Sequence, residues 1–330
     1  MTIRFKKDRI EFTSGLNTYT MVGTSDGIAF SGTLDANQFV ASGFQGTIAG
    51  YTSGGYSSSP GGYRIIDKFP FATNANAVDV GDLSTLTTMT TGQSSDTHGY
   101  ASGTQGTPTV PFSPFLGIEK FSFATNENSK YVGELSASGQ YRTAGASSDT
   151  HGYTSGGGNI IDKFAFSTDG LATDVGDLTQ SRKYAAGQSS TVSGYVSGGE
   201  PASTVIDKFP FATNANATDV GDLTVGRYAS AGQSSTVSGY NSGGFGPTNS
   251  NVIDKFPFST DANATDVGDL TQVRFRAVGQ SSVVSGYTSG GQIVPTIYNT
   301  IDKFPFASDA NATDVGDLTA ARNRASGQQV

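Results

Sequence analysis

The two histidines of the chain stand in the same heptapeptide, Ser-Ser-Asp-Thr-His-Gly-Tyr, which occurs twice. Histidine and carboxylate side chains are ligands that transition-metal ions accept. Asp96 and His98 could therefore form a metal site with Asp149 and His151 if neighbouring repeats bring the two copies together. The alternative, which we favour because no third ligand stands at a fixed spacing, is that these are polar residues of two hairpin turns. We therefore expect neither a metal nor a cofactor.

Carboxylates also recur in the sequence Asp-Val-Gly-Asp, which places two of them three residues apart. The pairs are Asp79/Asp82, Asp174/Asp177, Asp219/Asp222, Asp266/Asp269 and Asp314/Asp317. Clustered carboxylates suit calcium, but the dense Asp-x-Asp-x-Asp-Gly spacing of a calcium loop is missing. We expect instead that these charges lie on exposed strand edges and prevent edge-to-edge association.

One lysine recurs directly after an acidic residue. The six copies are Lys68, Lys120, Lys163, Lys208, Lys255 and Lys303. A ring of lysines could bind an anionic glycan. We expect instead that each lysine forms a solvated ion pair with the adjacent carboxylate, an interaction that contributes little to stability.

Aromatic residues stand in the connections that differ most among the repeats. The candidate binding residues are Tyr56, Tyr63, Phe112, Phe115, Phe245 and Tyr298. Exposed aromatic rings on loops bind sugars or proteins by stacking and apolar contact. The alternative is that the rings fold down and cover their own loops, and the sequence leaves both readings open.

The composition argues against several other functions. The chain has no cysteine, no Ser-His-Asp arrangement and no phosphate-binding glycine loop, so we expect no enzyme. A net charge of -8 argues against a nucleic-acid partner. No apolar run approaches the roughly 18 residues that span a bilayer, and residues 1–7 lack the apolar core of a signal peptide.

A repeated unit must position all of these residues. The motif Ile-Asp-Lys-Phe, or Ile-Glu-Lys-Phe in the second copy, begins at Ile66, Ile118, Ile161, Ile206, Ile253 and Ile301, at intervals of 52, 43, 45, 47 and 48 residues. From Phe39 onward each unit reads as four short strands, which is the pattern of a propeller blade. The sequence therefore predicts an all-β, six-bladed propeller over residues 39–330, with four antiparallel strands per blade.

The order of side-chain sizes within a unit supports this architecture. The first two strands are rich in Ala, Gly and Ser, whereas the third and fourth carry Ile, Phe, Val and Leu. Blades converge at the axis, so small residues fit inside and bulky ones outside. The connections between second and third strands vary in length. Because they emerge on one face, that face is expected to bind a partner.

The two ends of the chain depart from the repeat. Residues 1–38 do not fit it and are predicted to form a small β segment that docks or oligomerises. Residues 322–330 are a seventh copy of the first strand, while residues 41–46 resemble the same strand. We expect residues 322–330, which carry the repeat's arginine, to close blade one.

The units resemble kelch-type β-propeller repeats, in which an arginine opens the first strand, Gly-Gly ends the second and an aromatic precedes a tryptophan. The corresponding arginines are Arg182, Arg227, Arg274 and Arg322, and the aromatics are Phe71, Phe166, Phe211, Phe258 and Phe306. The tryptophan position holds Thr173, Thr218, Thr265, Thr313 or Val78, and the chain has no tryptophan. The resemblance covers residues 39–330 and implies a kelch-like fold without the family's tryptophan.

The near-identical Ser/Thr/Asn-rich units also resemble repeats in virion proteins of tailed phages of aquatic and cyanobacterial hosts, and residues 27–39 look like β segments that precede modules in phage fibres. This resemblance implies a non-enzymatic structural protein of the virion, a tail fibre or similar appendage, assembled in the host cytoplasm. We expect it to contact other virion proteins through residues 1–38, to form a homo-oligomer, and to bind a host glycan or protein. The alternatives are a capsid decoration protein or a kelch-like interaction scaffold outside a virion.

Overall fold

A computed structural model describes the backbone of residues 2–5, 9–14, 17–24, 27–31, 44–57, 61–105, 114–137 and 142–330, and the side chains of residues 44–57, 61–103, 116–137 and 142–330. The chain divides into two compact units, Met1–Val40 and Ala41–Val330. The described residues form strands and turns, and none of them belongs to a helix that could cross a membrane.

The first unit contains one antiparallel sheet whose strands follow chain order. The strands are β1 (Thr2–Phe5), β2 (Arg9–Ser14), β3 (Asn17–Thr24) and β4 (Gly27–Ser31). In the backbone pairing, Ile3 lies opposite Phe12 and Met21 lies opposite Phe30.

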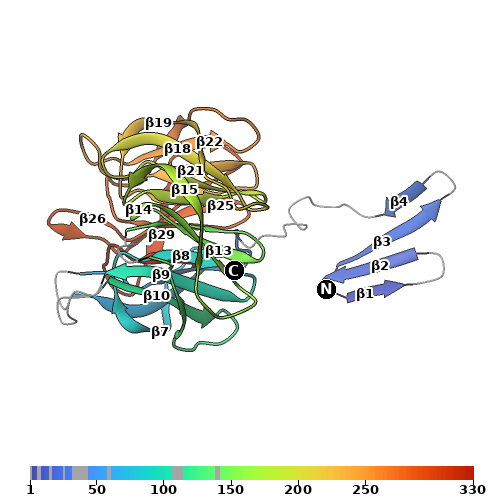
Figure 1. Ribbon diagram of the computed structural model, residues 1–330. Helices are drawn as coiled ribbons and strands as arrows, with labels where there is room; N and C mark the ends of the chain where they lie inside the picture. The colour runs from blue at the N-terminus through green and yellow to red at the C-terminus, as the bar shows by residue number, and fades with distance from the viewer. Residues whose placement is uncertain are drawn as a thin grey trace. The chain divides into compact units, whose positions relative to one another are not determined.

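The second unit is a six-bladed β-propeller, as the repeat predicts, and each blade is an antiparallel sheet of four strands (Figure 1). Blade one contains β30 (Ser326–Gln329), β5 (Ala49–Ser53), β6 (Tyr63–Pro70) and β7 (Val78–Thr87). Blade two contains β8 (Thr91–Ser94), β9 (His98–Gln105), β10 (Pro114–Ser122) and β11 (Lys130–Glu134). Blade three contains β12 (Ala144–Ser147), β13 (His151–Ser155), β14 (Gly158–Ala165) and β15 (Thr173–Arg182).

The remaining three blades follow the same order from the axis outward. Blade four contains β16 (Ala186–Ser189), β17 (Ser193–Ser197), β18 (Ser203–Pro210) and β19 (Thr218–Arg227). Blade five contains β20 (Ala231–Ser234), β21 (Ser238–Ser242), β22 (Val252–Pro257) and β23 (Thr265–Asp269). Blade six contains β24 (Val278–Ser281), β25 (Ser285–Ser289), β28 (Thr300–Pro305) and β29 (Thr313–Asp317), with a small hairpin of β26 (Gln292–Ile293) and β27 (Thr296–Ile297).

Small residues let the six inner strands approach one another closely. Each inner strand carries a glycine, and a Cβ added at any of them would overlap the backbone carbonyl of the corresponding glycine in the preceding blade. The ring consists of Gly92, Gly145, Gly187, Gly232, Gly279 and Gly327. Alanine would therefore not fit at these positions, which explains why the repeat keeps a glycine in its first strand.

Aromatic residues pack the blades against one another. In each junction a tyrosine of one second strand contacts two phenylalanines of the next blade, one in the third strand and one directly after it. Tyr153 is typical, because its ring lies 4.7 Å from that of Phe211 and 5.5 Å from that of Phe209. The six core tyrosines are Tyr51, Tyr100, Tyr153, Tyr195, Tyr240 and Tyr287, and burial raises the pKa of each to about 12.

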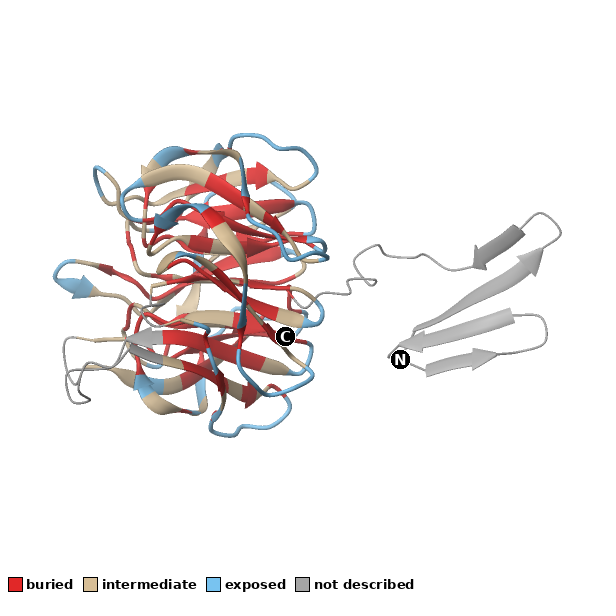
Figure 2. Cartoon of the chain, in the orientation of Figure 1, coloured by how far each residue is buried: buried red, intermediate tan, exposed pale blue. Residues whose placement is uncertain are grey.

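The ring is closed by a strand from the end of the chain. β30 pairs with β5, with Gln328 opposite Tyr51, and so forms the inner strand of blade one. Residues 44–46 do not occupy this slot. Gly46 instead forms a parallel bridge with Ser282 of blade six. In Figure 2 most buried residues of the propeller lie along the strands, and most exposed ones lie in the connecting loops. Blade one therefore joins segments separated by more than 270 residues.

Candidate binding face and channel mouth

The connections between second and third strands differ in length from blade to blade. Blade three has only residues 156–157 between the two strands, whereas blade five has residues 243–251 and blade six has residues 290–299, which include the β26–β27 hairpin. Four of these connections form an antiparallel bridge with the segment that enters the inner strand of the same blade. The bridges are Tyr56 with Asn323, Glu200 with Lys183, Phe245 with Tyr228 and Gln292 with Phe275. The variable connections therefore surround one mouth of the central channel, and we call this side the loop face.

A closed ring of backbone hydrogen bonds encircles that mouth. One residue just before each inner strand donates its N–H to the carbonyl of the corresponding residue in the preceding blade, over 2.6 to 3.2 Å. In cyclic order the six residues are Met89, Arg142, Tyr184, Ala229, Arg276 and Arg324, and Met89 donates to Arg324 to complete the circle. We call these residues the mouth ring. Their backbone polar groups are satisfied without water, which fixes their positions.

All six residues of the mouth ring adopt left-handed backbone, with φ between 54° and 64°. Left-handed backbone is uncommon for residues other than glycine, and it costs energy that the surrounding structure must offset. The ring nevertheless contains no glycine but three arginines, a tyrosine, a methionine and an alanine. The conformation is thus common to all six blades, while the side chains that it presents differ.

The channel behind the mouth ring is a cavity of about 150 Å³. Phe44 contributes to its lining, and Gln45 lies at the end away from the loop face, where its Nε2 donates to the carbonyls of Ser234 and Ser282 over 3.0 and 3.1 Å. The segment that leads into blade one thus lies against that end of the channel. The loop face lies at the other end of the channel.

Two of the predicted binding residues lie beside the mouth ring. The Phe245 ring packs 5.4 Å from Tyr228 and 5.7 Å from Phe275, in a row of aromatic residues on the loop face. The Tyr56 ring lies 5.3 Å from the guanidinium of Arg324. Both rings are half-buried, so each presents part of its surface to solvent.

Of the other four candidate residues, the structure describes the side chains of two and not those of the other two. Tyr63 begins β6 and lies opposite Thr87, and the side chain is half-buried. Tyr298 is also half-buried, and its backbone bonds Gly291 and Arg322. Phe112 and the side chain of Phe115 lie outside the described residues, although the backbone of Phe115 belongs to β10. Tyr56 and Phe245 therefore carry the argument for the loop face.

Both histidines follow the turn between the first two strands of their blades. Thr97 Oγ1 lies 2.8 Å from His98 Nδ1, and Thr150 Oγ1 lies 2.8 Å from His151 Nδ1. Burial lowers the pKa of each histidine, and a nearby lysine lowers it further. Among the side chains that the structure describes, no three His, Asp or Glu residues are grouped as metal ligands would be.

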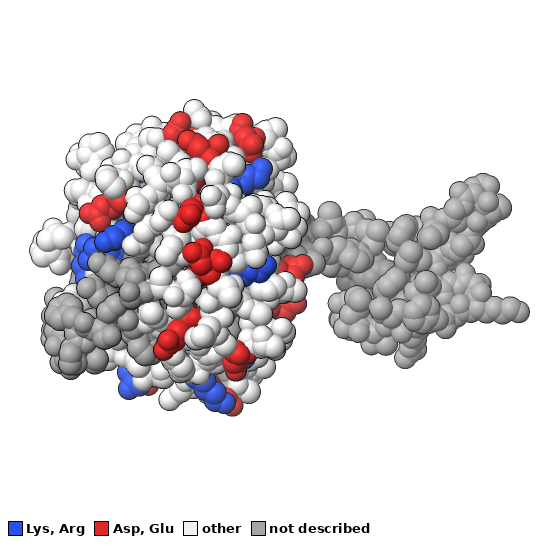
Figure 3. All heavy atoms as spheres, in the orientation of Figure 1, with Lys and Arg blue, Asp and Glu red and all other residues white. Residues whose placement is uncertain are grey.

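The paired aspartates have local backbone partners. The first of each pair accepts a hydrogen bond from the glycine two residues on, as Asp219 does from Gly221 over 3.2 Å. The second donates its N–H to an asparagine of the next blade, as Asp222 does to Asn263 Oδ1 over 3.0 Å. The outer strand is thus bonded at this point to its neighbour and is not a wholly free edge. Acidic side chains are scattered over the surface seen in Figure 3, with basic side chains between them.

The expected pairing of the lysines with their adjacent carboxylates is wrong. Lys208 pairs instead with Asp261 of the next blade over 3.1 Å, and Lys255 pairs with Asp309 over 2.9 Å. The adjacent acid cannot be the partner because successive side chains of a strand point to opposite faces. Asp207, which precedes Lys208, is fully buried.

Four of the buried aspartates that precede a lysine pair with an arginine, which was not expected from the sequence. The repeat's arginines reach from one blade to the aspartate of the next, and all eight side chains are at most 2 % exposed. The pairs are Arg182–Asp207, Arg227–Asp254, Arg274–Asp302 and Arg322–Asp67, over 2.5 to 3.0 Å. The signal was present in the sequence, because an Arg and an Asp of opposite charge recur together in four units.

In comparisons with known proteins, no protein-family model matches the sequence, and no curated protein matches it either.

Proposed function

We propose that the protein is a non-enzymatic structural protein of a phage particle, a tail fibre or similar appendage, that binds a partner through its loop face. The partner is a glycan or protein of the host surface, or a neighbouring subunit. In this proposal residues 1–38 connect the propeller to other virion proteins and hold several copies together. The protein acts in the virion, after assembly in the host cytoplasm.

One observation carries the binding part of this proposal. The connections that vary in length gather around one channel mouth, where Tyr56 and Phe245 are half-buried beside other aromatic and cationic groups. A rigid frame with variable loops on one face is typical of recognition modules. Aromatic side chains contribute strongly to binding because they offer large contact area with few rotatable bonds.

The sequence supports the virion part. The near-identical Ser/Thr/Asn-rich units and residues 27–39 resemble segments of phage fibres, and residues 1–38 do not belong to the repeat. Light scattering of the full chain and of residues 41–330 tests the role of the first unit. We expect an oligomer only for the full chain, and an oligomer of the shorter chain would contradict this role.

A glycan array and whole-cell adsorption, both with labelled protein, test the loop face. The variant Tyr56→Ala/Phe245→Ala removes the two well-placed rings. The control Val192→Ala/Val237→Ala removes two aliphatic side chains that are 66 % and 65 % exposed in turns at the other end of the inner strands. We expect the unmodified protein and the control to bind, and the loop-face variant to lose at least about tenfold in affinity.

The other outcomes distinguish the alternatives. Equal losses in variant and control would place the binding elsewhere and contradict the loop-face proposal. If the unmodified protein binds no glycan and no cell, the receptor part is wrong, and the loops more simply pack against another subunit, as in a capsid decoration protein.

A further inference from the structure

Three arginines of the mouth ring meet at the opening of the channel. The guanidinium carbon of Arg142 lies 4.6 Å from the centre of the Tyr184 ring, and that of Arg276 lies 5.7 Å from the same ring. Both cations thus lie within cation–π distance of the same ring. Arg324 lies next to Arg276 in the mouth ring, so positive charge comes from three different blades.

No carboxylate compensates this charge at Arg276 or Arg324 among the described side chains. Neither arginine forms an ion pair there, whereas Arg182, Arg227, Arg274 and Arg322 each hold an aspartate. The propeller segments 41–43, 58–60, 104–115 and 138–141, whose side chains lie outside the description, contain no Asp or Glu. Burial lowers the pKa of Arg324, and Arg276 and Arg142 lower it further by repulsion.

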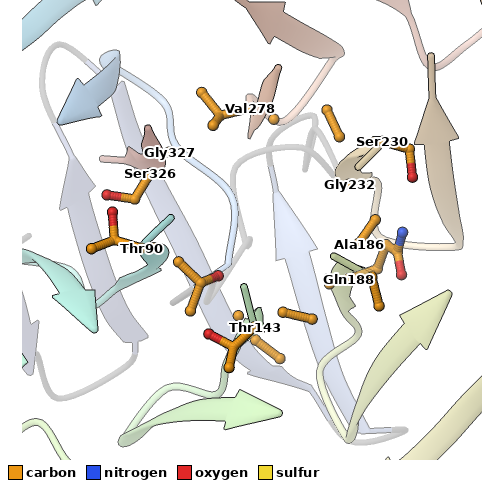
Figure 4. A pocket seen from close by; sticks show the side chains of 18 of the residues that line it. Thr90, Thr143, Ala186, Gln188, Ser230, Gly232, Val278, Ser326 and Gly327 are labelled. Carbon is orange, nitrogen blue, oxygen red and sulfur yellow. The ribbon is translucent and has the colours of Figure 1, made fainter. Parts of the chain in front are cut away.

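A second set of polar groups lies one residue deeper in the channel. Thr90, Thr143 and Ser230 directly follow three residues of the mouth ring, and they are 8 %, 8 % and 9 % exposed. Their hydroxyl oxygens have no hydrogen-bond partner within the described structure, and all three line the cavity (Figure 4). Buried hydroxyls almost always have a hydrogen-bond partner, so these three are available to a water, an ion or a ligand in the channel.

The shape of the channel limits what can enter. The cavity of about 150 Å³ is the size of one that accommodates benzene, so it admits a group no larger than a single ring. Phe44 and Gln45 lie toward the far end, which leaves the arginine-lined mouth as the side of entry.

We propose that this mouth binds an oxyanion, a carboxylate or sulfate group carried by a ligand whose anionic end is no larger than one ring. Arg276 and Arg324 supply the positive charge, with Arg142 beside them. The hydroxyls of Thr90, Thr143 and Ser230 donate hydrogen bonds to the oxyanion from one residue deeper in the channel. Arginine is suited to this role because its planar fork donates two parallel hydrogen bonds to such groups. The site does not depend on the virion proposal, and a partner bound only by the outer aromatic rings would not need it.

Isothermal titration calorimetry of the full chain tests the site, with sodium sulfate, sodium glucuronate and neutral glucose as probes at constant ionic strength. The variant is Arg276→Gln/Arg324→Gln. The control, Lys208→Gln/Lys255→Gln, makes the same change in net charge at two lysines that are 30 % exposed and paired with aspartates. Thr143→Val tests the hydroxyl layer without changing charge.

We expect saturable binding of sulfate or glucuronate but not of glucose. The arginine variant should bind at least about tenfold more weakly, because charge-assisted hydrogen bonds are the strong ones. The control should bind normally, and Thr143→Val should bind more weakly than the unmodified protein. Tighter binding of glucuronate than of sulfate would identify an acidic sugar as the source of the oxyanion, and the reverse order would identify a sulfate group.

Thermal unfolding shows whether the arginine variant still folds. In chloride alone its midpoint should equal or exceed that of the unmodified protein, because the change relieves repulsion. Sulfate should raise the midpoint of the unmodified protein only. The proposal is overturned if no oxyanion binds saturably, or if the lysine control loses as much affinity as the arginine variant.

Discussion

The ion pair between Arg227 and Asp254 offers the sharpest test of what holds neighbouring blades together. Arg227 ends β19 of blade four, and its Nη2 lies 3.0 Å from Asp254 Oδ2 in β22 of blade five. The side chains are 2 % and 0 % exposed. Asp254 also accepts hydrogen bonds from the N–H and the hydroxyl of Thr224, over 3.0 and 2.7 Å. We predict that Asp254→Asn strongly destabilises the propeller.

The magnitude follows from what the substitution leaves behind. Asparagine is nearly isosteric and keeps one oxygen for Thr224, so packing changes little. The guanidinium of Arg227 stays buried, however, and loses its counter-charge. Removing one partner of a buried ion pair costs about 3–5 kcal/mol, whereas breaking an exposed pair costs about 0–1 kcal/mol. We expect the free energy of unfolding to fall by about 3 kcal/mol.

Equilibrium urea unfolding followed by circular dichroism and tyrosine fluorescence measures this change, since the chain has no tryptophan. Lys255→Met is the control, because it breaks the exposed 2.9 Å pair with Asp309 and should cost less than about 1 kcal/mol. The double variant Arg227→Met/Asp254→Leu removes both charges and should recover much of the loss. The reasoning is refuted if Asp254→Asn costs no more than Lys255→Met.

Three further predictions concern the core and the mouth ring. Gly187→Ala should prevent folding or destabilise the propeller by more than about 3 kcal/mol, because the new Cβ would overlap a neighbouring carbonyl. Urea unfolding measures this change. The control Gly158→Ala, which has no atom within 4 Å of the added Cβ, should be almost neutral. Ala229→Gly should raise the free energy of unfolding by up to about 1 kcal/mol because φ is 56° there, whereas Ala231→Gly in β20 should lower it by about 1 kcal/mol; the same sign for both would contradict the strain. The six core tyrosines should ionise near pH 12 in absorbance titration. Because their pKa is raised in the folded state, their contribution to stability should be complete below about pH 10 and should fall as the pH rises toward 12. Ionisation near pH 10 would contradict their burial.

The fold could be predicted because the same strand pattern recurs in every repeat. The Ile-Asp-Lys-Phe period gives the number of blades, and the change from Ala, Gly and Ser to Ile and Phe gives the order of strands. The lysine pairing was predicted wrongly because adjacency along a strand was taken for adjacency in space. Alternation of side chains separates Asp207 from Lys208 and directs the aspartate to Arg182.

The mouth ring could not have been found from residue types. Its members are one Met, one Tyr, one Ala and three Arg, and what they share is a backbone conformation and a hydrogen bond from the N–H to the preceding blade. No residue type is shared by all six positions, so the repeat pattern does not reveal them. The variable loops were found because length differences are visible in the sequence, yet how Tyr56 and Phe245 pack depended on neighbours from other blades or distant segments.

The pairing of β30 with β5 also has a consequence for the order of events on the ribosome. Residues 326–329 are synthesised after every other strand of the propeller, so β5 emerges early and waits for its inner partner. During that interval its edge is open, and an unpaired strand edge can pair with another nascent chain. Slowing translation between β5 and β30 should therefore favour aggregation, while supplying the last strand earlier by circular permutation should reduce it.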